Sequence, residues 1–126
     1  MNVVGVGIDL VDVERFRTSL RRTPSMIERM FTEGERAYSL AANDPTERFA
    51  VRFAAKEAVM KAMGVGLGAF GFHDVEVIRA EGGCPSLGVY GPADALARER
   101  SIRGWQISLT HTATSAGAVV IATTQP

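Results

Sequence analysis

The chain has 126 residues with 14 acidic and 14 basic side chains, which suits one domain over residues 1–126 whose core needs no structural metal. Zero formal net charge argues against nucleic acid as the main partner, because binding to phosphate backbones usually needs a basic excess. The lone Cys84 excludes an intrachain disulfide, no apolar run is long enough to cross a membrane, and the N-terminal residues match a secretion signal poorly, so a cytoplasmic location is expected.

The first predicted element is a strand over residues 2–11 that is apolar on both faces and therefore suited to burial. Strict alternation places on one face Val4, Val6, Ile8 and Leu10, and on the other Val3, Gly5, Gly7, Asp9 and Val11. Asp9 is then the only charge on a buried strand. Such a carboxylate either pairs with an arginine or belongs to a site, and the neighbouring glycines would permit close approach to it.

Four helices are predicted after this strand, and each begins with a recognisable signal. The signals are, in chain order, a capping Asp12, a proline at the first helical position, the capping-box spacing of Thr32 and Glu35, and a capping Asp44. The expected helical ranges are about 12–22, 24–30, 32–42 and 44–63, and Gly64 is well placed to end the last of them.

The second half of the chain predicts mostly strands. A glycine-rich loop over residues 64–71 follows the longest helix. Strands are then expected at about 72–80, 86–90, 105–112 and 116–124, a short helix at 92–100, and turns at 81–83, 104 and 114–115. The predicted fold class is therefore α+β, with an N-terminal strand, a helical block that includes one long buried helix, and an antiparallel sheet.

The longest helix carries the most informative charges. Apolar residues surround it almost completely, which indicates burial on most sides. Glu57 and Lys61 are four residues apart and share one face with small alanines, so the simplest interpretation is a solvated ion pair. The helix has no broad polar face, however, and Asp9 is a second isolated carboxylate. Asp9 and Glu57 together suggest a magnesium site that water and substrate phosphates would complete.

Two other polar residues have alternative interpretations. Arg52 lies about 140° around the helix from Glu57, so it cannot easily serve the same pocket within one subunit. It either forms a solvent-facing stripe with Lys56 or serves a pocket of a neighbouring subunit. His111 stands at the end of a predicted strand, where it is either a structural residue or, when protonated, a phosphate ligand.

Three arginines, Arg15, Arg22 and Arg29, recur every seven residues in the helical block. This spacing keeps side chains near one face of a helix. The apolar residues interspersed with them are Phe16, Leu20, Met26 and Met30. A basic surface with apolar contacts suits an acidic helical partner, and the alternative is an ordinary solvated face.

Three stretches together resemble the short, single-domain 4′-phosphopantetheinyl transferases, the holo-acyl-carrier-protein synthases. They are residues 5–16 (GVGIDLVDVERF), residues 52–64 (RFAAKEAVMKAMG) and residues 108–112 (SLTHT). The resemblance covers nearly the whole chain, the second stretch is specific, and all three occur in the family's order. Cys84 is a departure, because many relatives have a basic residue at this position before the proline.

The resemblance implies a Mg²⁺-dependent transfer of 4′-phosphopantetheine from coenzyme A to a serine of apo-acyl carrier protein, with release of 3′,5′-ADP. It implies that Asp9 and Glu57 hold Mg²⁺ and take part in catalysis. It also implies that Lys61 contacts the phosphates and helps to protonate the departing one.

The same resemblance assigns binding roles to further residues. Arg52, Gly64 and His111 would contact coenzyme A, with His111 coming from a neighbouring subunit of a homotrimer. The acidic recognition helix of the carrier protein would dock on Arg15, Arg22 and Arg29.

Two other classes of function are compatible with the residues alone. A regulatory module that senses coenzyme A would need the pocket but not Lys61. A structural oligomeric subunit would need neither, and Glu57 and Lys61 would then form only an ion pair. The sequence identifies neither the carrier protein nor the general base.

Overall fold

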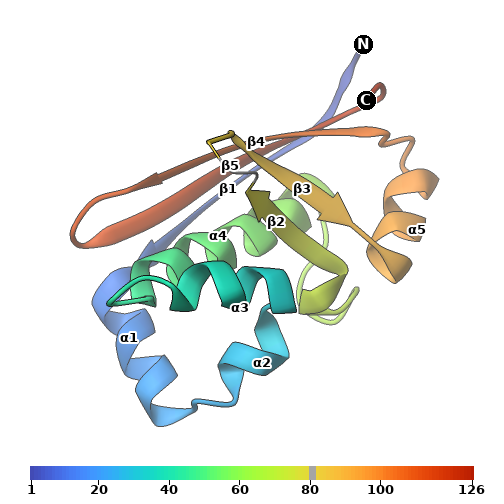
Figure 1. Ribbon diagram of the computed structural model, residues 1–126. Coiled ribbons are helices and arrows are strands. Elements are labelled where there is room, and N and C mark those ends of the chain that lie inside the picture. The colour runs from blue at the N-terminus through green and yellow to red at the C-terminus, as the bar shows by residue number, and fades with distance from the viewer. Residues whose placement is uncertain (80–81) are drawn as a thin grey trace.

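The computed structural model describes residues 1–79 and 82–126, which form two antiparallel sheets and a group of helices (Figure 1). The elements in chain order are β1 (Val3–Asp12), α1 (Val13–Arg22), α2 (Met26–Met30), α3 (Glu33–Leu40), α4 (Thr46–Ala62), the short 3₁₀ helix η1 (Phe72–Asp74), β2 (Val75–Arg79), β3 (Pro85–Val89), α5 (Gly91–Glu99), β4 (Gly104–His111) and β5 (Ser115–Thr123). None of the described helices combines the length and apolar character needed to cross a membrane.

The predicted α+β class and the order of its elements are confirmed. The expected strand at 72–80 is shorter than predicted, because η1 occupies its first residues. Residue 80 of that strand and residue 81 of the expected turn lie outside the described residues.

The strands form two sheets where the sequence predicts one. The larger sheet has the strand order β1-β5-β4, so the N-terminal strand pairs with the C-terminal one. β2 and β3 form a separate hairpin. The two sheets share no ladder among the described residues, and α5 separates β3 from β4 in the chain.

α4 lies against one face of the larger sheet and is buried along most of its length (Figure 1). Its backbone touches β1, because Gly5 and Gly7 have no side chain. A Cβ atom at Gly5 would lie less than 3.0 Å from the carbonyl oxygen of Ala62, and one at Gly7 would lie as close to that of Ala58. The space that the glycines leave beside Asp9 is therefore filled by the helix and does not admit a ligand.

The other face of β1 is exposed in the single chain. Its four apolar side chains have exposed fractions of 39% for Val4, 59% for Val6, 64% for Ile8 and 72% for Leu10. The prediction that β1 is buried on both faces is wrong for this one. The physical reason is that α4 covers one side of the strand, and no described element covers the other.

Candidate active site

Asp9 and Glu57 line the same cleft, which has a volume of about 370 Å³. Asp9 comes from β1 and Glu57 from α4, and the close contact of these two elements brings the carboxylates together. The other lining residues are Leu10, Val11, Asp12, Arg15, Phe16, Ser19, Met26 and Phe53. The structure thus joins two charges that are distant in the sequence.

Lys61 adds a positive charge beside these carboxylates. Its Nζ lies 3.1 Å from Asp9 Oδ1 and donates to the carbonyl oxygen of Ile8 at 3.0 Å. The Lys61 side chain is about half exposed, and that of Asp9 is 17% exposed. The ammonium group can therefore contact a ligand in solvent without leaving Asp9.

The pKa of Glu57 is raised above its ordinary value, first by burial and then by the negative charge of Asp9, while Lys61 partly offsets the shift. Burial disfavours the ionised carboxylate because it removes water, and a like charge nearby disfavours it further. A divalent cation between Asp9 and Glu57 would remove this repulsion.

The donor set fits magnesium. The described residues contain no group of three or more His, Cys, Asp or Glu side chains that could enclose a metal ion. A metal in this cleft would therefore have two carboxylates from the protein and further ligands from water or substrate. Mg²⁺ is usually held in this way, because it retains several waters and prefers hard oxygen ligands.

Arg52 lines a different cavity, of about 260 Å³, together with Tyr38, Glu76 and Arg79. Its side chain is nearly inaccessible, and the guanidinium lies 4.4 Å from the centre of the Tyr38 ring. Nη1 donates to the carbonyl oxygen of Arg48 at 3.1 Å, whereas Nε and Nη2 have no hydrogen-bond partner in the described part of the chain. Burial lowers the pKa of this arginine from its ordinary value.

The sequence interpretation in which Arg52 and Lys56 form a solvent-facing stripe is wrong. Their exposed fractions are 2% and 0%, because α3, β2 and η1 pack over this side of α4. Two buried guanidinium nitrogens without partners carry a desolvation cost, and an anion in the cavity would relieve it.

Gly64 and His111 lie outside the Asp9 cleft of the same chain. Gly64 follows α4 with a φ of +69°, a left-handed conformation that glycine adopts without strain. His111 ends β4, where its half-exposed ring has Nδ1 3.0 Å from Glu47 Oε1 at the start of α4.

Arg15, Arg22 and Arg29 are all exposed, the first two on α1 and the third on α2. Arg15 also borders the Asp9 cleft, so this basic surface is continuous with the candidate site. Most of the apolar residues between the arginines are not available to a partner, because Phe16, Leu20 and Met30 are buried in the core beneath the helices and only Met26 remains partly exposed.

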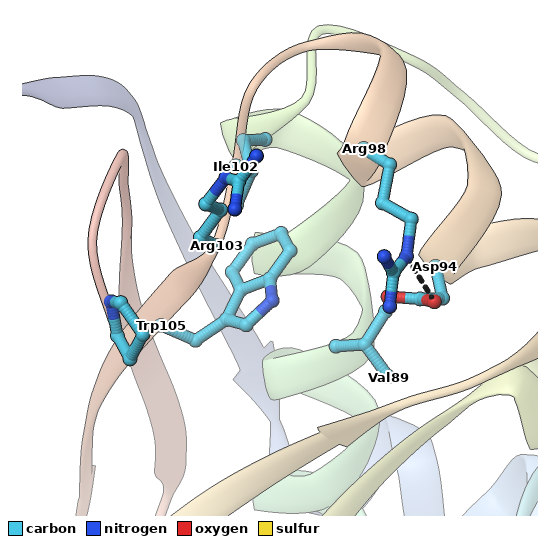
Figure 2. Close-up of a pocket in the computed structure, with 7 residues that line it drawn as sticks. Val89, Asp94, Arg98, Ile102, Arg103 and Trp105 are labelled. Atoms are coloured by element: carbon cyan, nitrogen blue, oxygen red, sulfur yellow. Dashed lines mark hydrogen bonds and ion pairs between the residues drawn. The ribbon is translucent and has the colours of Figure 1, made fainter.

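A larger cavity, of about 420 Å³, lies between α5 and the beginning of β4 (Figure 2). Trp105, Arg98 and Arg103 line it, and Arg98 is already paired with Asp94 at 2.9 Å. Neither Asp9 nor Glu57 lines this cavity. The charged residues that the sequence singled out, Asp9 and Glu57, meet instead in the smaller cleft.

Some residues at these sites were not predicted from the sequence. Asp12 is interpretable as a helix cap and does accept the Arg15 backbone N–H at 2.8 Å, but it also borders the Asp9 cleft. Tyr38 stacks on Arg52, although no local pattern links the two. Its position depends on how α3 packs on α4, which sequence spacing does not reveal.

The comparisons with known proteins agree on one family. Residues 5–122 match the 4′-phosphopantetheinyl transferase superfamily. The chain is 48% identical to the holo-[acyl-carrier-protein] synthase of Frankia alni, over 97% of this chain and 98% of that protein.

Solved structures show the same likeness. The holo-[acyl-carrier-protein] synthase of Neisseria meningitidis superposes with a TM-score of 0.88 at 27% identity, covering 97% of this chain and 99% of that one. The Bacillus anthracis synthase, solved in complex with CoA (3′,5′-ADP), has a TM-score of 0.79 at 32% identity, covering 95% and 96%. The chain therefore belongs to the holo-[acyl-carrier-protein] synthases of the 4′-phosphopantetheinyl transferase superfamily.

Proposed function

We propose that the chain transfers 4′-phosphopantetheine from coenzyme A to a serine hydroxyl of apo-acyl carrier protein, with Mg²⁺ as cofactor and 3′,5′-ADP as the second product. The observation that carries this proposal is the convergence of Asp9 and Glu57 in one cleft, with Lys61 3.1 Å from Asp9. The family membership and the coenzyme A complex of the Bacillus anthracis relative support the choice of substrate.

The reaction exchanges the phosphoanhydride bond of coenzyme A for a phosphoester bond to the carrier serine. The serine oxygen bonds to the β-phosphorus of coenzyme A, and the bond from this phosphorus to the oxygen of 3′,5′-ADP breaks. One of the two cleft carboxylates takes the serine proton, and Lys61 supplies a proton to the departing phosphate. When bound by Asp9 and Glu57, Mg²⁺ would neutralise charge on the pyrophosphate.

Coenzyme A would extend from this cleft along α4. Gly64 follows Lys61 by less than one helical turn, so its backbone can approach the same phosphates. Arg52 offers two buried donors without partners, which suit the 3′-phosphate. His111 is half exposed and would add a second cation when protonated.

Active sites at the subunit interfaces of a homotrimer would explain the spread of these residues. Arg52 and Glu57 line different cavities of one chain. A single coenzyme A would contact the Glu57 cleft of one subunit and the Arg52 cavity of another more easily across an interface. The exposed apolar face of β1 supplies a surface for such contacts. Contiguous apolar patches on a soluble protein commonly mark an interaction surface.

The carrier protein would dock on the basic surface of α1 and α2. Arg15 borders the Asp9 cleft, so a partner held by Arg15, Arg22 and Arg29 would present its serine near the carboxylates. Positive charge there would also accelerate the encounter with an acidic helix.

Mass spectrometry tests the proposal directly. The purified chain, apo-acyl carrier protein, coenzyme A and Mg²⁺ should together give a carrier heavier by one phosphopantetheine and an equal amount of 3′,5′-ADP. Chelation of the metal should stop the transfer, and Asp9→Asn should match the chelated reaction. If the chain binds coenzyme A but transfers phosphopantetheine to none of several carriers, a sensing module would be favoured instead.

A further inference from the structure

A fully buried ion pair joins α3 to α4 next to the candidate site. Lys56, the residue before Glu57, has its Nζ 2.8 Å from Glu35 Oε1, and both side chains are completely inaccessible. The same ammonium donates to the carbonyl oxygens of Phe72, at 2.8 Å, and of Val75. Each of its three hydrogens therefore has an acceptor.

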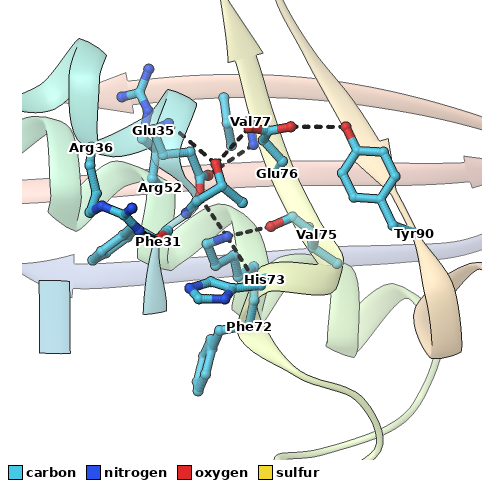
Figure 3. A network of polar contacts seen from close by, with 12 residues as sticks. Phe31, Glu35, Arg36, Arg52, Phe72, His73, Val75, Glu76, Val77 and Tyr90 are labelled. Atoms are coloured by element: carbon cyan, nitrogen blue, oxygen red, sulfur yellow. Dashed lines mark hydrogen bonds and ion pairs between the residues drawn. The ribbon is translucent and has the colours of Figure 1, made fainter. Parts of the chain in front are cut away.

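Glu35 is equally well satisfied. Its carboxylate accepts the backbone N–H of Thr32 at 3.0 Å, which completes the capping box of α3, and that of Val77 at 2.9 Å. Figure 3 shows Glu35 between the beginning of α3 and β2, with Phe72 and Val75 close by. One ion pair thus connects α3, α4, η1 and β2.

The attraction between the two charges does not by itself account for this arrangement. Removing two charges from water costs about as much as their attraction returns, and apolar replacements of buried ion pairs are often as stable as the original. Burial is strong enough here to lower the pKa of Lys56 from its ordinary value despite the adjacent carboxylate. The specific contribution of the pair is its geometry.

That geometry holds the place where the glycine-rich loop returns to the core. The loop leaves α4 just after Lys61, where the Val65 N–H donates to the carbonyl oxygen of Met60 at 3.0 Å. It returns at Phe72, whose carbonyl oxygen is held by Lys56. Both ends are therefore fastened to the last two turns of α4. Between them, added side chains at Gly66 and Gly68 would meet open space. Phe70 is buried in the core and the Gly71 N–H donates to Asp74 Oδ2 at 2.8 Å, so Lys56 holds the returning end together with these two contacts.

We propose that Lys56 is a positioning residue for coenzyme A. By holding Phe72 it helps to fix the returning end of the 64–71 loop beside α4, while the Gly64 N–H, which donates to the carbonyl oxygen of Lys61 at 3.0 Å, holds the other end where the coenzyme A phosphates would bind. The proposal rests on the proposed function, because it assumes that coenzyme A occupies this region. It assigns to the buried pair a role in substrate affinity that a purely structural pair would lack.

Two variants separate affinity from stability. In Glu35→Gln, the buried Lys56 loses its counter-charge but keeps Phe72, so the Tm should fall while the KM for coenzyme A stays near wild type. In the double variant Lys56→Met, Glu35→Leu, Phe72 is released, and the Tm should also fall because the backbone groups that the pair satisfied lose their partners. The KM for coenzyme A should then rise about tenfold, with kcat and the KM for the carrier little changed.

Ile102→Ala, a core substitution beside α5, is the matched control for destabilisation. It should lower the Tm and leave the KM for coenzyme A unchanged. A KM that follows the Tm through all these variants, or a double variant with wild-type KM, would overturn the proposal. If the double variant does not fold, Lys56→Gln paired with Glu35→Gln replaces it, with the same expected rise in KM.

Hydrogen exchange tests the loop independently of activity. The amides of residues 64–71 should exchange faster in the double variant than in wild type or Glu35→Gln, in the absence of coenzyme A. Unchanged exchange would contradict the positioning role even if the enzyme is active. Faster exchange in a chain that transfers nothing would support the role of Lys56 in holding the loop and would reject the proposed function.

Discussion

The α-carbon of Gly7 packs against the carbonyl oxygen of Ala58, so closely that a Cβ atom at this glycine would lie within 3.0 Å of the oxygen. This contact sets the separation of β1 and α4, and hence that of Asp9 and Glu57. Gly7→Ala should therefore destabilise the fold by about 1–3 kcal/mol and reduce Mg²⁺-dependent transfer even in the folded fraction.

Chemical denaturation and transfer assays on the same preparation measure both effects. Gly66→Ala is the control, because an added methyl group there would meet open space and should leave stability and transfer nearly unchanged. A Gly7→Ala protein as stable and active as wild type would show that the backbone contact does not hold the carboxylates together.

Glu57→Gln should separate stability from activity. The pKa of Glu57 is raised above its ordinary value of 4.5, so its stabilising contribution is present while it is protonated and is lost as the pH rises through the raised pKa. Glutamine mimics the protonated form. The variant should therefore gain a few degrees in Tm at pH 7, gain nothing at pH 4, and lose transfer by at least about a hundredfold.

Magnesium supplies a second readout for the carboxylates. Binding to the native state alone must raise the Tm. Added Mg²⁺ should therefore stabilise wild type more than Asp9→Asn or Glu57→Gln, as measured by thermal denaturation without coenzyme A. Equal shifts in all three proteins would place the metal somewhere else.

Arg52→Met should weaken the binding of coenzyme A through its 3′-phosphate. Loss of a charge-assisted contact worth about 1.5–3 kcal/mol corresponds to a KM roughly 10- to 100-fold higher. With 3′-dephospho-coenzyme A as substrate, wild type and variant should have the same KM. If the substitution raises the KM for both substrates equally, Arg52 serves only to pack α3 against α4.

The exposed arginines should control affinity for the carrier. Replacing Arg15, Arg22 and Arg29 by glutamate should raise the KM for acyl carrier protein about tenfold or more, with a smaller difference at high salt, where charges are screened. The KM for coenzyme A should stay constant. Replacing three exposed arginines in and just after α5, Arg98, Arg100 and Arg103, by glutamate changes the net charge by the same amount and should have little effect.

Ile8→Glu on the exposed face of β1 should prevent assembly. Sedimentation should find wild-type trimers and variant monomers, with activity lost in the monomer because the coenzyme A site would be incomplete. Leu40→Glu adds the same charge at another exposed apolar position and should stay trimeric. Fully active monomers would remove the interface placement of His111.

Local signals made most element boundaries predictable. The capping box of Thr32 and Glu35 and the positive φ of Gly64 depend only on residues within a turn or two, and both occur as expected. The isolated charges Asp9 and Glu57 were recognisable because each interrupts an otherwise apolar element. Their convergence then required only that the strand and the helix pack together.

Partners that are distant in the sequence were not predictable. Nothing near Lys56 indicates that Glu35 would neutralise it, so a solvent-facing lysine was a reasonable but wrong expectation. Alternation along β1 correctly gave two apolar faces, yet it could not say that α4 covers only one of them. Such outcomes depend on tertiary packing, which periodicity does not encode.

β1 combines an outward apolar strip with a position at the edge of its sheet. An edge strand can pair with strands of other molecules through its backbone hydrogen-bonding groups, and exposed apolar side chains favour this association. In the proposed assembly, newly synthesised chains would be protected from aggregation only after other copies of the chain cover this face. Heating a solution dilute enough for the subunits to dissociate should accordingly cause precipitation. The refolding yield should decline as the delay between folding and assembly increases.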